Sequence, residues 1–239
     1  MLSLYQGFFG NDATLTVDFV GSDDENRFKE NLNTQSDDWY YRTHGITYSY
    51  NSLGHRCKEV EDIDLDNYLL FTGCSHTEGI GLELEKTYPY RVAEMLGCDY
   101  YNLALGGSGI DLMTHNLTMW NKYIPKKPKA LIILWPHETR FLTTYNGYIR
   151  MNLVSDGNYK AKRFIAAGED VNFFNSRKDF SETLITNLYD GCKIVPAGWN
   201  KYPKELSLSL GTGDYARDFK HSGIESNEKF AVEIAELLR

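Results

Sequence analysis

Short, continuous apolar runs are spaced along the second part of the chain. Residues 68–72 (YLLFT) and 130–135 (ALIILW) are the clearest of these runs. Such runs are typical of strands that are buried on both faces of a sheet. Residues 100–104 (YYNLA) and 193–197 (KIVPA) are further strand candidates of the same kind.

Segments with helical periodicity separate these apolar runs. Residues 88–96 carry apolar positions at helical spacing, and Gly97 follows as a C-terminal stop. Residues 108–123 begin with S-x-x-D, the pattern of a capping box, and predict a second helix. Residues 180–189 predict a third helix, and the strongly amphipathic residues 226–238 predict the last one.

Strands that alternate with helices predict βαβ units. We therefore expect an α/β protein, a three-layer α/β/α sandwich with a central, mainly parallel sheet. Ligands of such sheets bind beyond the carboxyl ends of the strands. Reactive side chains are expected in the loops that follow residues 72, 104, 135 and 197.

The remaining segments lack this regular alternation. Residues 1–66 are polar, rich in Asn and Asp, and weakly periodic apart from a β-like alternation at residues 46–51. We expect them to form an N-terminal extension that packs on a main domain of residues 67–239. Two glycine-containing turns within residues 141–177 predict a hairpin, and residues 198–224 predict a long loop.

Composition narrows the classes of function. The chain has 239 residues, 42% of them hydrophobic and 24% charged, which is an ordinary balance for a globular protein. Its formal charge of −8 disfavours nucleic acid as a partner. The N-terminus shows no secretory signal and no apolar run is long enough for a bilayer, so we expect a cytoplasmic protein without a membrane partner. The four cysteines form no C-x-x-C pair, which disfavours a zinc ribbon and predicts free thiols.

The candidate chemistry lies at two loops that are far apart in the sequence. The first predicted strand is followed by G-C-S-H-T-E-G, in which Ser75 lies just past the strand end. A serine hydroxyl is a weak nucleophile until a base takes its proton. The loop before the last helix reads D-F-K-H and supplies Asp218 and His221. There His221 would deprotonate Ser75, while Asp218 would orient the imidazole.

At these residues the sequence resembles the SGNH (GDSL-type) hydrolase family, over about residues 67–239. The segment G-C-S-H-T-E-G resembles the first family block, with Ser75 as the nucleophile, and D-F-K-H-S-G resembles the last, with Asp218 and His221. The segment N-L-A-L-G-G-S resembles the second block, whose glycine donates a backbone N–H to the oxyanion, and Gly107 is the best match. The resemblance implies a serine esterase on the predicted sandwich, which works without a cofactor.

The sequence departs from the family pattern at two places. Cys74 stands where the family has an aspartate. The third block, G-x-N-D, reads W-P-H-E-T-R here, which aligns His137 with the oxyanion-binding asparagine. A histidine N–H can donate a comparable hydrogen bond, so we expect an oxyanion site formed by Gly107, His137 and the backbone N–H of Ser75.

These observations lead to a primary hypothesis and two alternatives. The primary hypothesis is a serine esterase that forms an acyl-enzyme, with a small ester or an acylated glycan as substrate. An O-acetyl ester on carbohydrate is expected by analogy with the family and from the abundance of tyrosine. One alternative is a degenerate SGNH-like protein that binds without turnover. The other is a flavodoxin-like nucleotide or phosphate binder, which Glu78 and the lack of a lysine in the first loop disfavour.

A metal site is also disfavoured. The residues that would suggest one are His76, Glu78, His115, His137 and Glu138. Their spacing fits no known ligand motif, so no metal is expected.

Overall fold

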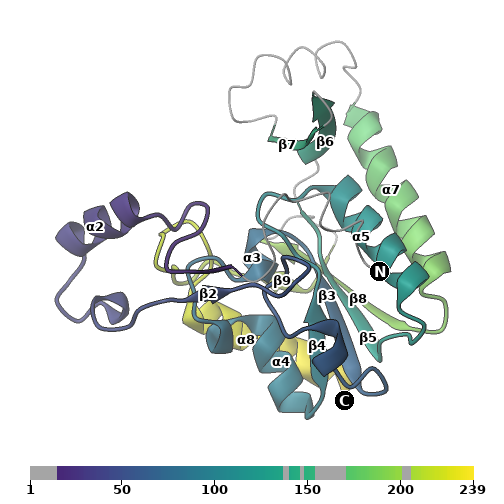
Figure 1. The fold of residues 1–239 in the computed structure, drawn as a ribbon, viewed down its shortest axis with the longest axis horizontal. Coiled ribbons are helices and arrows are strands. Elements are labelled where there is room, and N and C mark those ends of the chain that lie inside the picture. The colour runs from purple at the N-terminus through teal and green to yellow at the C-terminus, as the bar shows by residue number, and fades with distance from the viewer. Residues whose placement is uncertain (1–14, 137–139, 146–147, 154–170, 201–205) are drawn as a thin grey trace.

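A parallel sheet forms the centre of the protein. The computed structural model describes residues 15–136, 140–145, 148–153, 171–200 and 206–239. The five-stranded sheet has the order β4-β3-β5-β8-β9, and all its neighbouring pairs are parallel (Figure 1). The strands are β3 (Tyr68–Thr72), β4 (Asp99–Asn102), β5 (Ala130–Leu134), β8 (Lys193–Trp199) and β9 (Ser209–Leu210). The predicted α/β class and parallel sheet are confirmed.

Helices cover both faces of this sheet. One face packs against α4 (Tyr88–Leu96) and α8 (Ile224–Leu238), and the other against α5 (Ile110–Tyr123) and α7 (Val171–Leu188) (Figure 1). Successive strand side chains point to opposite faces. In β3, for example, Leu70 packs in the α5–α7 layer and Phe71 in the α4–α8 layer. Both faces therefore need apolar residues, which explains the continuous apolar runs of the sequence.

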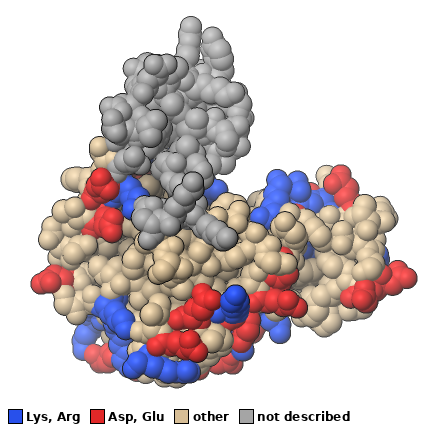
Figure 2. All heavy atoms as spheres, turned by 180° about the vertical axis from the view of Figure 1, so that it is seen from behind, with Lys and Arg blue, Asp and Glu red and all other residues tan. Residues whose placement is uncertain are grey.

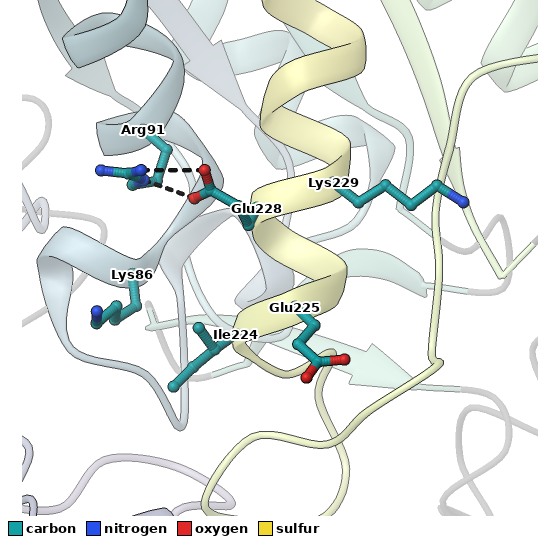
Figure 3. A pocket seen from close by; sticks show the side chains of 6 residues that line it. All are labelled: Lys86, Arg91, Ile224, Glu225, Glu228 and Lys229. Carbon is teal, nitrogen blue, oxygen red and sulfur yellow. Dashed lines mark hydrogen bonds and ion pairs between the residues drawn. The ribbon is translucent and has the colours of Figure 1, made fainter.

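An ion pair links the two helices of the α4–α8 layer. Figure 3 shows Arg91 of α4 reaching across to Glu228 of α8. The guanidinium Nε and Nη2 donate to the two carboxylate oxygens at 2.6 and 3.0 Å. Deeper in the layer, the Asn227 side chain accepts from the Tyr88 backbone N–H and donates to the Ser222 carbonyl. These contacts fix the loop that precedes α8.

Three predicted boundaries need correction. The capping box at residues 108–111 is wrong, because α5 begins at Ile110 and the Ser108 hydroxyl instead donates to the Gly73 carbonyl at 2.8 Å. The third helix begins at Val171 and not near residue 180. The predicted loop of residues 198–224 contains the edge strand β9, which is too short to leave a periodic signal. The expected hairpin is present as β6 (Arg140–Tyr145) and β7 (Tyr148–Leu153).

The N-terminal segment adds a small cluster of elements beside the sheet. It contains β1 (Thr16–Val17), α2 (Glu25–Thr34), η1 (Tyr40–Arg42), β2 (Tyr48–Ser49) and η2 (Val60–Asp62). Its apolar residues Tyr41, Ile46 and Tyr48 form a core cluster with Ile80 and Ala216. In Figure 1 this purple segment lies beside the yellow loop that precedes α8. The contacts bring the N-terminal segment close to the predicted functional loops.

The surface carries charges of both signs. Figure 2 shows the molecule from behind relative to Figure 1, with Lys and Arg side chains interleaved with Asp and Glu side chains along its lower edge. Within the described residues, no helix combines the length and the apolar character needed to cross a bilayer.

Candidate active site

Ser75 opens a short helical turn at the carboxyl edge of the sheet. The turn, α3 (Ser75–Glu78), follows β3 after only two residues. One of these residues is Gly73, where an added Cβ would lie 2.1 Å from the Thr77 hydroxyl and 2.9 Å from the Leu134 carbonyl oxygen. Only glycine leaves room here for the chain to pass from β3 into α3 beside the end of β5. The turn places Ser75 where parallel sheets bind their ligands.

The structure brings Ser75, His221 and Asp218 together. The Nε2 atom of His221 lies 2.7 Å from the Ser75 hydroxyl, and its Nδ1 atom lies 2.7 Å from Oδ2 of Asp218. The backbone N–H groups of Lys220 and His221 donate to the other carboxylate oxygen at 3.0 and 3.1 Å. Phe219, which lies between Asp218 and Lys220 in the sequence, adopts a positive φ of 55°, which is uncommon for a bulky side chain. The tight loop thus holds the carboxylate and the imidazole in one orientation.

The ionisation of Asp218 settles which imidazole nitrogen carries the proton. Burial alone would raise the pKa of Asp218, but the hydrogen bond and charge of His221, followed by the hydrogen bond from Ser22, hold that pKa well below its usual value. An ionised carboxylate can only accept hydrogen bonds, so Nδ1 of His221 is the donor. The lone pair of Nε2 then faces the Ser75 hydroxyl, which is the arrangement of a general base beside a nucleophile.

A second imidazole lies against His221. The ring of His76 is 4.6 Å from that of His221 and 4.4 Å from that of Trp199, which ends β8. Burial lowers the pKa of His76 well below its usual value, and the charges of His221 and Arg140 act in the same direction. The His76 side chain is therefore neutral, and it packs against the imidazole of His221 without placing a charge beside it.

A buried carboxyl group, that of Glu78, lies against the turn that contains Gly106 and Gly107. Burial raises the pKa of Glu78, whose Oε1 accepts a hydrogen bond from the Tyr50 hydroxyl at 2.7 Å. An added Cβ at Gly106 would lie 3.1 Å from Oε2 of Glu78 and 3.9 Å from Cβ of Ser75. The next residue, Gly107, has a φ of 77°, a conformation that favours glycine. This turn is therefore packed close to Ser75.

The other predicted site residues have different outcomes. His137 and Glu138 lie outside the described residues. His76 and Glu78 belong to the site described above. No group of three or more His, Cys, Asp or Glu side chains is arranged to hold a metal ion in the part of the chain that the structure describes.

Sequence reasoning missed three residues that contact this site. Ser22 donates to Asp218, Tyr50 donates to Glu78, and Trp199 packs on His76. Ser22 lies in a turn of the N-terminal segment, where no periodic pattern indicates which side chains face the main sheet. Tyr50 alternates with Ile46 and Tyr48 in the β-like pattern of residues 46–51, which is a signal that it shares their buried face. The apolar run at residues 193–197 indicates a strand whose loop faces the site, which is a signal for the position of Trp199.

Comparisons with known proteins return solved structures only. No protein-family model and no curated protein sequence matches this chain. One similar structure is a carbohydrate esterase family 2 enzyme with a carbohydrate-binding domain from Corynascus thermopiles (Myceliophthora fergusii), at 15% identity and a TM-score of 0.49 over 72% of this chain and 65% of that chain. A second is an acetyl xylan esterase from the rumen bacterium Butyrivibrio proteoclasticus, at 14% identity and a TM-score of 0.47 over 82% of this chain and 66% of that chain.

A third similar structure is a carbohydrate esterase whose active site is described as having divergent catalytic and non-catalytic binding functions. It is 12% identical, with a TM-score of 0.46, over 72% of this chain and 64% of that chain. This chain therefore spans less than two thirds of the length of each of the three structures.

Proposed function

We propose that this protein is a serine esterase of the SGNH type. Ser75 is the nucleophile, His221 the general base, and Asp218 the residue that orients the imidazole. The observation that carries the proposal is the continuous chain of contacts from Ser75 through His221 to Asp218, with 2.7 Å at each step. The sequence blocks around these residues and around Gly107 support the same interpretation.

The reaction follows from this geometry. The Ser75 oxygen attacks the carbonyl carbon of the ester while Nε2 of His221 accepts the hydroxyl proton. The oxyanion is stabilised by the backbone N–H groups of Ser75 and Gly107, with His137 as the third donor. When the tetrahedral intermediate collapses, the bond to the leaving alcohol breaks and His221 returns the proton to it. A water molecule, deprotonated by His221, then attacks the acyl-enzyme. The bond to the Ser75 oxygen breaks, His221 returns the proton to that oxygen, and the carboxylic acid leaves, while Asp218 stays ionised throughout.

For the substrate we propose an O-acetylated carbohydrate. Many SGNH hydrolases act on such esters, and an aromatic pair with one exposed ring lies on the loop of the triad. The ring of Tyr215 is stacked on that of Phe219, with 5.9 Å between centroids and 24° between planes. Tyr215 is 51% exposed, so the part of its ring that does not pack on Phe219 can contact a ligand. Flat, exposed aromatic faces are suited to the apolar side of a sugar ring.

Hydrolysis of a chromogenic acetyl ester tests the proposed function. The Ser75→Ala variant is expected to lose at least about a thousandfold in kcat, because it lacks the hydroxyl that forms the acyl-enzyme. Ser36→Ala is the matched control, since Ser36 is an exposed serine that contacts Asp38 and not the triad. Equal rates for Ser75→Ala and the wild type would refute Ser75 as the nucleophile. A folded wild-type protein without turnover would instead support the non-catalytic alternative.

Acetate release from an acetylated oligosaccharide tests the substrate class. We expect faster release from the acetylated sugar than from an acetyl ester of a simple alcohol. The Tyr215→Ala variant is expected to raise KM for the sugar and to leave KM for the simple ester unchanged. Equal KM values for the two proteins on the sugar would contradict the proposed role of Tyr215.

A further inference from the structure

The side chain of Ser22 reaches the acid of the proposed triad from the other end of the chain. Its hydroxyl donates to Oδ2 of Asp218 at 2.7 Å, although the two residues are 196 positions apart. The same oxygen accepts the hydrogen bond of Nδ1 of His221. The sequence blocks that resemble the SGNH family begin after residue 66, so none of them includes this serine.

A tight turn fixes the position of Ser22. Val20 and Asp23 exchange two backbone hydrogen bonds of 3.0 Å around Gly21 and Ser22. Gly21 supplies the positive φ of 61° that such a turn needs. Asp24, the residue that follows the turn, caps α2 by accepting a hydrogen bond from the Arg27 N–H at 2.9 Å. Strand-like pairing on one side and a helix start on the other leave the serine little freedom.

A buried ion pair holds this turn against the catalytic loop. Asp23 follows Ser22, and its carboxylate accepts from Nε and Nη2 of Arg217 at 2.9 and 2.8 Å. The side chains of Arg217 and Asp23 are only 3% and 1% exposed. In addition, the Asn31 side chain of α2 donates to the Arg217 carbonyl at 2.8 Å. Since Arg217 precedes Asp218, the pairs Ser22–Asp218 and Asp23–Arg217 are adjacent contacts between the same two segments.

We propose that Ser22 is a positioning residue for the catalytic triad, an inference that rests on the proposed function. Oδ1 of Asp218 is occupied by two backbone N–H groups, and Oδ2 accepts from His221 and from Ser22. Four donors match the lone-pair capacity of an ionised carboxylate. The serine therefore fixes the plane of the carboxylate and keeps it ionised, and the carboxylate in turn fixes the imidazole that faces Ser75.

Removal of this hydroxyl has a defined expected effect. A hydrogen bond to a charged group is stronger than a neutral one, and loss of this one loosens the imidazole without removing any substrate contact. We expect Ser22→Ala to lower kcat about tenfold with KM unchanged. Ser22→Thr keeps the hydroxyl and is expected to recover most of the loss. Ser36→Ala makes the same chemical change in the same segment and should have the wild-type kcat.

Two further measurements separate positioning from a purely structural role. In an Asp218→Asn background, Ser22→Ala is expected to cause little additional loss, because the two side chains act through one contact. In the proton NMR spectrum, the Nδ1 proton of His221 should resonate downfield of the amide region and disappear in His221→Ala. Ser22→Ala is expected to move this resonance, and Ser22→Thr to restore it.

The outcomes distinguish the inference from the proposed function. An unmoved Nδ1 resonance in Ser22→Ala, a wild-type kcat, or an equal loss in the Asp218→Asn background would overturn the positioning role. If Ser75→Ala abolishes hydrolysis while Ser22→Ala behaves as wild type, the esterase proposal stands and this inference fails. If no ester is hydrolysed but the resonance moves in Ser22→Ala and returns in Ser22→Thr, the contact positions His221 and the esterase proposal fails.

Discussion

The buried pair of Asp23 and Arg217 provides the sharpest test of how the N-terminal segment is attached. Asp23→Asn removes the negative charge and keeps the size of the side chain. Both partners are almost fully buried, at 1% and 3% exposure, so the guanidinium would remain in the interior without its counter-charge. The carboxylate also accepts a hydrogen bond from the Tyr48 hydroxyl, which the substitution weakens.

The expected loss of stability follows from this burial. Breaking a buried ion pair by removing one partner costs about 3–5 kcal/mol. Here the guanidinium also lies 4.7 and 5.1 Å above the rings of Phe19 and Phe28, which offsets part of the cost. We therefore expect about 3 kcal/mol. For a chain of this size each kcal/mol lowers Tm by about 2–4 °C, so Tm should fall by about 6–12 °C.

Thermal unfolding followed by circular dichroism measures this effect. Asp66→Asn is the matched control, since Asp66 pairs with Lys126 at the surface, where the side chains are 74% and 55% exposed. That pair should contribute at most about 1 kcal/mol. A double variant, Asp23→Leu with Arg217→Met, removes both charges and should recover part of the loss. Equal changes in Tm for Asp23→Asn and Asp66→Asn would refute the reasoning.

Two further predictions concern catalysis and pH. Asp218→Asn should lower kcat of ester hydrolysis about ten-thousandfold with the fold retained, because an amide no longer selects the Nδ1–H tautomer of His221; a loss under tenfold would contradict this. Burial lowers the pKa of His55 from 6.5 to about 3. The unfolded chain therefore binds a proton below about pH 6.5 that the folded protein does not, so stability should fall by about 1.4 kcal/mol per pH unit between about pH 6 and 3. Urea unfolding at several pH values gives the free energy of unfolding as a function of pH. This free energy should fall less steeply with decreasing pH in His55→Gln than in the wild type, and an identical dependence on pH would exclude His55 as the cause.

The central sheet and the meeting of Ser75 with His221 were predictable for a physical reason. Strands that are buried on both faces leave continuous apolar runs, and parallel strands place the loops that follow them at one edge. Ser75 follows such a strand directly, and His221 precedes a strongly amphipathic helix. The two loops therefore had to lie at the same edge if the alternation of strands and helices was correct.

The contribution of the N-terminal segment was not predictable in this way. Ser22 and Asp23 lie in a turn, and a turn has no apolar period that indicates its neighbours. Their partners, Asp218 and Arg217, are buried polar residues, and they pair with residues 196 and 194 positions away in the sequence. Ser108 failed as a helix cap for a related reason, because its hydroxyl instead donates to the Gly73 carbonyl, just before the turn that begins at Ser75.

Covalent labelling with a fluorophosphonate tests the central claim most directly. An activated serine attacks phosphorus, fluoride leaves, and the hydroxyl proton passes to the neighbouring base. Peptide mapping by mass spectrometry should find a single adduct, on Ser75, that forms much more slowly in His221→Ala. An adduct on another residue, or labelling of Ser75→Ala at the wild-type rate, would contradict the account.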